Sequence, residues 1–333
     1  MKTLPRNRVL TGDARRVLPK LLAESVDCCI TSPPYANGLR RYSDSKSELG
    51  QEQTVTDYVD NLRGVLREVR RVLKPSGSLF LNIGDAYSRS LRQGAPAKGL
   101  LLAPQRVALA LASDGWLIRN VICWSKPNPL PQSATDRLSP TYETIIFATK
   151  GPRYFFDADS IRIPHRSASR AKRQGREQGR RYQGNNTGLG RLKAAGLVGH
   201  PRGKNPGDVW TMPTAVDRLG HQATFPEALI ERPTLAACPE RICVQCDRAW
   251  KRPTRIKRIP TKEGLLQVRS VGELRRCDCF APSRPGVVLD PFFGTGTVGV
   301  VANRLGRDFL GIELNPTFSR LARRRLRRSG CGP

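Results

Sequence analysis

The first 150 residues alternate between short apolar runs and stretches with helical spacing. Residues 26–30 form a short, mostly apolar run that predicts a buried strand. From 56 to 73 apolar residues recur at helical spacing, which predicts a helix that Pro75 and Gly77 bring to an end. The same reasoning predicts strands at 78–83, 116–124 and 143–150 and a second helix at 104–113. This alternation predicts an α/β fold built on a mostly parallel, twisted sheet.

The pattern resumes near the C-terminus after two changes in composition. Residues 165–207 contain eleven Lys or Arg and a single acid, and residues 238–284 hold five of the nine cysteines. We therefore expect one α/β domain, made of residues 1–150, 208–237 and 285–333, interrupted by a basic, loop-rich insertion at 151–207 and a cysteine-rich insertion at 238–284. The last part is predicted to contain strands at 286–290 and 308–313 and helices at 296–305 and 315–328.

Composition restricts the class of protein. The 333 residues are 38% hydrophobic and 26% charged, which is typical of a soluble globular chain. We find no run of about 18 uncharged apolar residues and no signal-peptide core, so we expect no membrane span and a cytoplasmic location. Nine cysteines without a secretion signal favour metal binding or free thiols over disulfides.

The charge balance indicates the kind of partner. Lys and Arg number 57 against 28 Asp and Glu, a formal net charge of +29. Such an excess favours binding to a polyanion, because neutralising phosphates releases counterions. The alternative is an arginine-rich surface that is merely solvated.

A glycine-rich turn follows the strand at 286–290. The segment from Asp290 to Thr297 runs from a strand through Gly294 and Gly296 into a helix, where free backbone N–H groups favour a polar ligand. Glu313 lies seventeen residues beyond Gly296, at the end of the next strand, where a carboxylate can accept both ribose hydroxyls. Together these features indicate an adenosine-containing cofactor. Acidic Asp290 disfavours a pyrophosphate such as that of NAD and suits a cationic, amino-acid-like end; the alternative is an ordinary tight turn.

A second motif, Thr31-Ser32-Pro33-Pro34-Tyr35, ends the strand at 26–30. The lone pair of an exocyclic amine on an aromatic base is delocalised, so an amine that accepts a methyl group needs hydrogen-bond acceptors for its protons. Ser32 Oγ and the Pro33 carbonyl can accept them, and the two prolines hold both in a rigid turn. Tyr35 offers a ring on which an extruded base can stack. Alone, such a segment is more often a plain loop; beside a cofactor motif it becomes a candidate catalytic site.

In these two motifs the chain resembles the amino-methylating DNA methyltransferases, which modify cytosine N4 or adenine N6. The Ser-Pro-Pro-Tyr motif precedes the Phe-x-Gly-x-Gly motif at 292–296, an order similar to the family's beta arrangement. The likeness continues through segments 74–85, 124–131 and 221–226. It implies a Rossmann-like methyltransferase fold, S-adenosylmethionine as cofactor, double-stranded DNA as substrate and a target-recognition region at 151–207, for which a solvated linker is the alternative.

The resemblance also implies roles for individual residues. The implied catalytic residues are Ser32, Pro33, Pro34 and Tyr35. The implied cofactor-binding residues are Asp13, Thr31, Phe225, Asp290, Phe292, Phe293, Gly294, Gly296, Thr297, Glu313 and Asn315, with His221 in a matching segment. A cognate restriction endonuclease is compatible with the resemblance, but no residue indicates one, and neither the recognition sequence nor the oligomeric state follows from the sequence.

Ser32 favours cytosine N4 as the target, because adenine-modifying relatives more often carry Asp or Asn at this position. Ser-Pro-Pro-Tyr also occurs in adenine enzymes, so adenine N6 is the nearest alternative. An alternative from a different functional class is a zinc-containing nucleic-acid-binding protein with an inactive methyltransferase fold. An RNA or protein acceptor is a further alternative.

The cysteine-rich insertion predicts a small zinc-ribbon-like unit. Cys243 and Cys246 form one pair, and Cys277 and Cys279 form a second, so four thiolates are available for a tetrahedral zinc ion. Cys238 is an alternative ligand, and reduced surface thiols are the alternative to a metal site. The cysteines at 28, 29 and 123 lie in apolar strands and are expected in the core.

Overall fold

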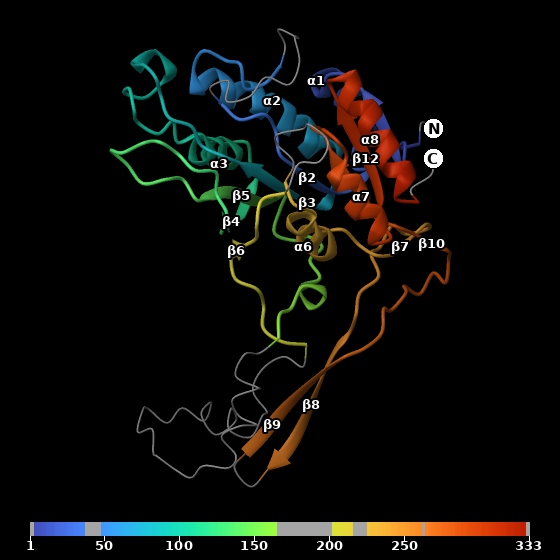
Figure 1. Ribbon diagram of the computed structural model, residues 1–333. Coiled ribbons are helices and arrows are strands. Elements are labelled where there is room, and N and C mark those ends of the chain that lie inside the picture. The colour runs from blue at the N-terminus through green and yellow to red at the C-terminus, as the bar shows by residue number, and fades with distance from the viewer. Residues whose placement is uncertain (1–2, 37–47, 165–201, 216–224, 262–263, 331–333) are drawn as a thin grey trace, which may run out of the picture.

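The computed structural model describes residues 3–36, 48–164, 202–215, 225–261 and 264–330 (Figure 1). Most of the predicted target-recognition region and His221 lie outside these residues. Within the described part of the chain, no helix has the length and apolar composition needed to span a bilayer.

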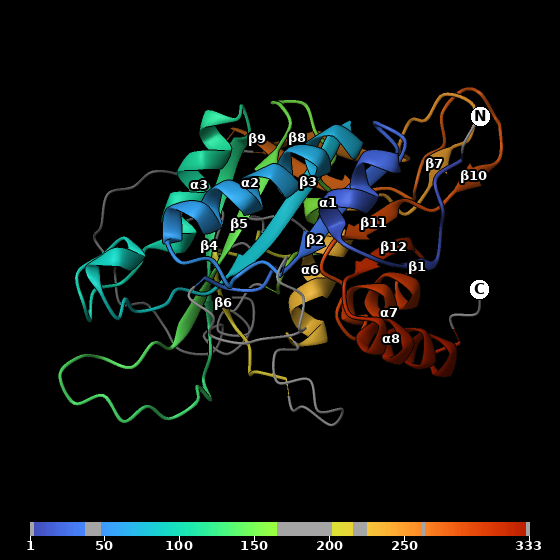
Figure 2. The same ribbon diagram turned by 90° about the horizontal axis from the view of Figure 1, so that it is seen from above.

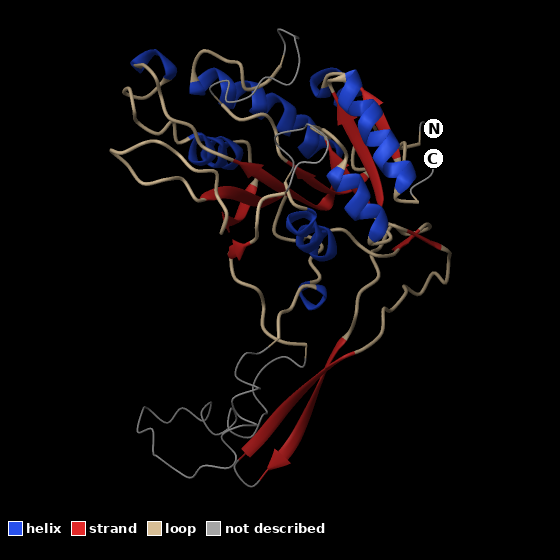
Figure 3. Cartoon of the chain, in the orientation of Figure 1, coloured by secondary structure: helices blue, strands red, loops and turns tan. Residues whose placement is uncertain are grey.

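An eight-stranded sheet forms the centre of the molecule (Figure 3). Its strands, in spatial order, are β1 (Arg8–Thr11), β12 (Asp308–Glu313), β11 (Val287–Asp290), β2 (Val26–Thr31), β3 (Leu73–Ile83), β5 (Tyr142–Thr149), β4 (Leu117–Ser125) and β6 (Val209–Thr211). All neighbouring pairs are parallel except the two that involve β5. The predicted α/β fold with a mostly parallel sheet is therefore confirmed.

Helices cover both faces of the sheet (Figure 2). One layer contains α1 (Ala14–Val17), α2 (Val55–Val72) and α3 (Ala103–Ser113), and the other contains α6 (Glu227–Ala237), α7 (Thr297–Arg304) and α8 (Pro316–Arg328). Strand residues alternate between the two cores: Cys29 packs with the α2 layer, whereas Cys28 and Ile30 pack with the α7 layer. Strands buried on both faces explain the continuous apolar runs in the sequence.

The predicted elements are present, with ends that move by one or two residues in most cases. The strand predicted at 78–83 is the exception, because β3 already begins at Leu73. The register between β2 and β3 shifts between Val26 and Cys28, so the exposed Pro75 lies at an irregularity of the ladder where its missing N–H is tolerated.

Further elements occur where no strand or helix was predicted from local patterning. Strand β1 and the short strand β6 form the two edges of the sheet. Among the described residues, short 3-10 helices lie at Leu18–Lys20, Leu91–Gln93 and Ala158–Ser160. The cysteine-rich insertion contains the antiparallel pair β7 (Ile242–Cys243) and β10 (Ser283–Arg284), and a hairpin of β8 (Thr254–Thr261) and β9 (Gly264–Val271) that projects away from the sheet (Figure 1).

Candidate active site

A cleft of about 1040 Å³ opens where β2, β3, β11 and β12 end. It brings together segments that are almost 300 residues apart in the chain, as expected for the carboxyl edge of a parallel sheet. The predicted site residues that line it are Asp13, Ser32, Pro33, Pro34, Tyr35, Phe225, Phe292, Phe293, Gly294, Thr297, Glu313 and Asn315. Thr31, Asp290 and Gly296 are not among its lining residues. They can contribute to the site only by supporting the residues that do line it.

A buried hydrogen bond joins the two motifs. Thr31 Oγ1 donates to Asp290 Oδ1 at 2.6 Å, and the same oxygen accepts the Phe292 N–H at 3.0 Å. Asp290 is 1% exposed, and burial raises its pKa to about 7 despite these hydrogen bonds. A cation bound nearby would stabilise the charged form of this carboxylate.

The glycine turn between β11 and α7 adopts the conformation that its sequence requires. Gly294 and Gly296 have φ angles of +53° and +85°, in the left-handed region that favours glycine. A Cβ atom at Gly296 would lie 3.2 Å from Cβ of Ala322 in α8, so the turn also packs tightly against that helix. These constraints fix the direction in which the start of α7 faces the cleft.

Glu313 holds the turn from the end of β12. Its Oε2 accepts the Gly294 N–H at 2.6 Å and its Oε1 accepts the Asn315 N–H at 2.7 Å. Burial raises the pKa of the Glu313 carboxyl above its ordinary value. Each carboxylate oxygen has a second lone pair, so the side chain can still accept hydrogen bonds from a ligand in the cleft.

Two further residues that line the cleft, Thr295 and Asp13, also suit a polar ligand. Thr295 Oγ1 is buried and has no hydrogen-bond partner among the described residues. Asp13 caps α1 by accepting the Arg15 N–H at 2.9 Å. Burial acts to raise the pKa of Asp13, but the hydrogen bonds and charge of Arg15 outweigh it and hold the pKa below its ordinary value. This donor and acceptor set fits a ligand with an adenosine and a cationic amino-acid end.

The turn at residues 32–35 is held by a polar network of side chains in β3, in β5 and directly after β4. The Tyr35 hydroxyl donates to Glu143 Oε2 at 2.6 Å, and Asn82 Nδ2 donates to both the Tyr35 hydroxyl and Glu143 Oε2 at 2.8 Å. Lys126 forms an ion pair with the other oxygen of Glu143. Ser32 Oγ lies 3.4 Å from the Tyr35 hydroxyl and from Asn82 Nδ2.

Backbone contacts fix the position of the Tyr35 ring. A Cβ atom at Gly84 would lie only 2.5 Å from Tyr35 Cε2, so the ring depends on the absence of a side chain there. On the other side of the turn, the Tyr58 hydroxyl donates to the Pro34 carbonyl at 3.0 Å. The turn therefore reaches the cleft as a rigid unit.

Four of these supporting residues had no predicted role. Asn82, Gly84 and Lys126 lie in segments that resemble the family, which is the signal that could have indicated them. Glu143 lies at the start of β5, outside any motif, and only the pairing of β5 with β3 and β4 brings it to the cleft.

The four predicted cysteine ligands lie together in the cysteine-rich insertion. The sulfur atoms of Cys243, Cys246, Cys277 and Cys279 are all within 4.8 Å of one another. Cys238 is not in this group; it lies buried at the end of α6. Hydrogen bonds from the backbone N–H groups of Cys246 and Gln245 lower the pKa of the Cys243 thiol to about 7, whereas hydrogen bonds with Cys246 and Cys277 raise the pKa of the Cys279 thiol.

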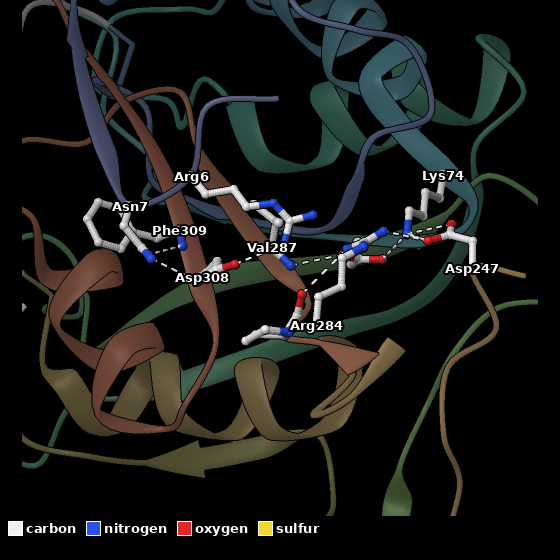
Figure 4. A network of polar contacts seen from close by, with 10 residues as sticks. Arg6, Asn7, Lys74, Asp247, Arg284, Val287, Asp308 and Phe309 are labelled. Carbon is white, nitrogen blue, oxygen red and sulfur yellow. Dashed lines mark hydrogen bonds and ion pairs between the residues drawn. The ribbon is translucent and has the colours of Figure 1, made fainter. Parts of the chain in front are cut away.

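A charged network connects this cysteine cluster to the sheet (Figure 4). Asp247, which directly follows Cys246, accepts from Lys74 at 2.7 Å and from Arg284 at 2.5 Å. Lys74 also pairs with the buried Asp27 of β2 at 2.8 Å, and Asp27 Oδ2 accepts the Val287 N–H at 2.9 Å. The cluster is thereby fixed to β2, β3 and β11, the strands that lead to the cleft.

Comparison with known proteins agrees with this geometry. The profile of the DNA methylase family matches residues 26–245 and 278–324. The type II methyltransferase M.SmaI of Serratia marcescens is 32% identical over 96% of this chain and 91% of its own length. The type II methyltransferase M.SfiI of Streptomyces fimbriatus is 32% identical over 92% of this chain and 88% of its own length.

Two solved structures share the fold. The PvuII DNA methyltransferase, described as cytosine-N4-specific, has a TM-score of 0.55 and 20% identity, covering 96% of this chain and 86% of its own. The S-adenosyl-L-methionine complex of a protein described as a putative DNA modification methylase from Thermus thermophilus has a TM-score of 0.53 and 23% identity, covering 97% and 93%. The large mostly parallel sheet is thus that of DNA methyltransferases.

The fold, the cleft and these relatives define the class: the chain belongs to the DNA methylase family. It is a site-specific DNA methyltransferase that uses S-adenosylmethionine to modify an exocyclic amine. The resemblance stated from the sequence is confirmed, and the alternative of an inactive nucleic-acid-binding protein is not favoured.

Proposed function

We propose that this enzyme transfers the methyl group of S-adenosylmethionine to N4 of a cytosine extruded from double-stranded DNA. The observation that carries the proposal is the Thr31–Asp290 hydrogen bond, which lies at the base of one cleft. It couples the turn at 32–35, which we call the catalytic turn, to the glycine turn between β11 and α7, which we call the cofactor turn. Bound there, the cofactor supplies an electrophilic methyl group on a sulfonium. The protein's task is to align an acceptor nitrogen with that methyl group.

The cofactor half of the cleft is assigned by the chemistry of its side chains. Glu313 accepts the ribose hydroxyls, and buried Asp290 supports the turn while its charge favours the cationic end of the cofactor. The other proposed contributors are Asp13, Thr31, Phe225, Phe292, Phe293, Gly294, Gly296, Thr297 and Asn315.

The catalytic half positions the acceptor base. Ser32 Oγ and the Pro33 carbonyl accept hydrogen bonds from the exocyclic amine, and the Tyr35 ring stacks on the extruded base. For transfer, the nitrogen–carbon bond would form as the carbon–sulfur bond breaks with its electron pair left on sulfur, and the amine would release one proton to water in the open cleft. The network of Asn82 and Glu143 keeps the Tyr35 ring in one orientation, which is the alignment that direct transfer requires.

Ser32 supports cytosine as the target. A serine hydroxyl at this position is more typical of N4-modifying relatives than Asp or Asn, and the PvuII enzyme that shares the fold is described as cytosine-N4-specific. Adenine N6 is the second candidate, since the Ser-Pro-Pro-Tyr motif serves both bases.

The net charge of +29 supports a duplex DNA substrate, and the basic insertion at 151–207 is our proposed target-recognition region. The names of M.SmaI and M.SfiI as type II methyltransferases support a cognate restriction endonuclease as the biological partner.

We also propose that the four clustered cysteines bind one structural zinc ion. Their sulfur atoms converge from two segments of the cysteine-rich insertion, and four thiolates are a typical structural zinc set. Elemental analysis of the purified protein should find one zinc per chain, lost in Cys246→Ser and retained in Cys123→Ser, whose thiol lies outside the cluster. A folded, metal-free wild-type protein would contradict this assignment.

Nucleoside analysis tests the main proposal. Purified enzyme is incubated with S-adenosylmethionine and unmethylated phage DNA, and the DNA is digested and examined by mass spectrometry. N4-methylcytosine is expected; N6-methyladenine would overturn the base assignment and keep the chemistry. Tyr35→Ala should reduce turnover with cofactor affinity intact, whereas Glu313→Ala should weaken cofactor binding, and loss of both properties in each variant would refute the division of the cleft.

A further inference from the structure

The loop between β4 and β5, residues 126–141, projects beyond the sheet and forms one wall of the cleft (Figures 1 and 2). Leu130 and Leu138 of this β4–β5 loop both line the cleft, and their side chains are 75% and 91% exposed. Leu138 is the most exposed large hydrophobic side chain in the described part of the chain. A single exposed leucine is common on protein surfaces and needs no explanation by itself. The contacts of the loop that carries Leu138, and the other residues of the cleft, decide whether it has a role.

Side-chain contacts hold the segment next to Leu138, whose own side chain is in solvent. The Arg137 guanidinium lies 3.8 Å from the centre of the Tyr87 ring, and it donates to Gln132 Oε1 at 2.8 Å and to the Leu138 carbonyl at 3.3 Å. Lys98 pairs with Asp136 at 2.7 Å. These exposed contacts link the β4–β5 loop to the segment at 86–102 and favour the position from which Leu138 faces solvent.

The cleft that Leu138 lines also carries other exposed apolar groups and cationic groups. Leu102 and Tyr142 line the same cleft and are 45% and 56% exposed. Arg89 and Arg137 also line it, in a chain whose net charge is +29. Cations attract phosphates, and an exposed apolar side chain beside a cation can enter the base stack of the bound duplex.

We propose that Leu138 enters the DNA duplex at the target site and fills the space that the extruded base leaves. This inference rests on the proposed function, because it requires a base to leave the duplex and enter the cleft. Extrusion exposes the faces of the neighbouring base pairs to water, and burying the leucine against them offsets part of the cost of unstacking. The β4–β5 loop thus acts on the duplex while the catalytic turn acts on the extruded base.

Fluorescence of a base analogue gives a direct test. The recognition sequence is mapped on plasmid DNA methylated by the wild-type enzyme, and a short synthetic duplex is made with 2-aminopurine in place of the target base. Wild-type enzyme should raise its fluorescence as the base leaves the stack. Leu138→Ala should diminish this rise and lower kcat/KM on the unmodified duplex about tenfold, with cofactor affinity unchanged. Leu138→Met, which keeps the apolar volume, should retain both.

Leu109→Ala is the matched control, because Leu109 is 70% exposed on α3 and does not line the cleft. It should behave as the wild type. Wild-type fluorescence and turnover in Leu138→Ala would overturn the proposal. Methylation by the wild type without any rise in fluorescence would overturn it too, while leaving methyl transfer intact; absence of any DNA methylation would overturn the proposed function itself.

Discussion

Replacing Gly84 with alanine should separate methyl transfer from cofactor binding. The new Cβ atom would lie 2.5 Å from Tyr35 Cε2 and 2.8 Å from Cδ2, whereas ordinary contacts begin near 3.4 Å. The ring must therefore move by about 1 Å, which breaks the 2.6 Å hydrogen bond from the Tyr35 hydroxyl to Glu143. Because the ring borders the cleft, it can move without unfolding the domain. A misplacement of this size costs about a hundredfold in turnover.

The assay measures kcat/KM on unmethylated DNA and, separately, the Kd for S-adenosylmethionine by calorimetry. We expect the first to fall about a hundredfold and the second to stay within about twofold. Gly64→Ala is the control: Gly64 lies in α2 with no atom within 4 Å of an added Cβ, so the change should stabilise the protein by about 0.5–1 kcal/mol and leave turnover unchanged. Wild-type turnover in Gly84→Ala would refute the role given to the Tyr35 ring.

Three further predictions concern the support of the site. Thr31→Val removes the hydrogen bond to Asp290 and should weaken cofactor binding about tenfold, measured by calorimetry; an unchanged Kd would contradict the coupling. Because the pKa of Asp290 is about 7 and the cofactor's cationic end favours the carboxylate, cofactor affinity should rise as pH increases from 6 to 8, and Asp290→Asn should flatten this profile. Lys74→Met leaves the buried Asp27 carboxylate without its lysine and should cost about 3 kcal/mol of unfolding free energy in urea, much of it regained when Asp27→Asn is added.

The sequence predicted the parts of this fold that local patterning controls. Strand β12 begins and ends as predicted at 308 and 313, because a buried parallel strand is a short apolar run between two helices. The helix predicted at 56–73 corresponds to α2, whose apolar face makes the pattern visible. Edge strands β1 and β6 are short and partly exposed, so they lack such a pattern.

Some residues of the candidate site could likewise be predicted from the sequence, and others could not. Segments that must form a special turn, such as Ser32–Tyr35 and the glycines at 294 and 296, are recognisable from their residues alone. Glu143 is not, because its role depends on which strands pair across the sheet and on the fold of the β4–β5 loop. The Lys74–Asp247 ion pair likewise joins residues that only the tertiary structure brings together.

A single-turnover experiment tests the central claim most directly. Enzyme loaded with S-adenosylmethionine carrying a labelled methyl group is mixed with excess unmethylated duplex DNA, and the label in DNA and protein is followed over time. Direct transfer within one cleft predicts that each bound cofactor delivers one labelled methyl group to cytosine N4 and that no label becomes covalently attached to the protein. Label that accumulates on the protein, or that fails to reach DNA, would contradict the account.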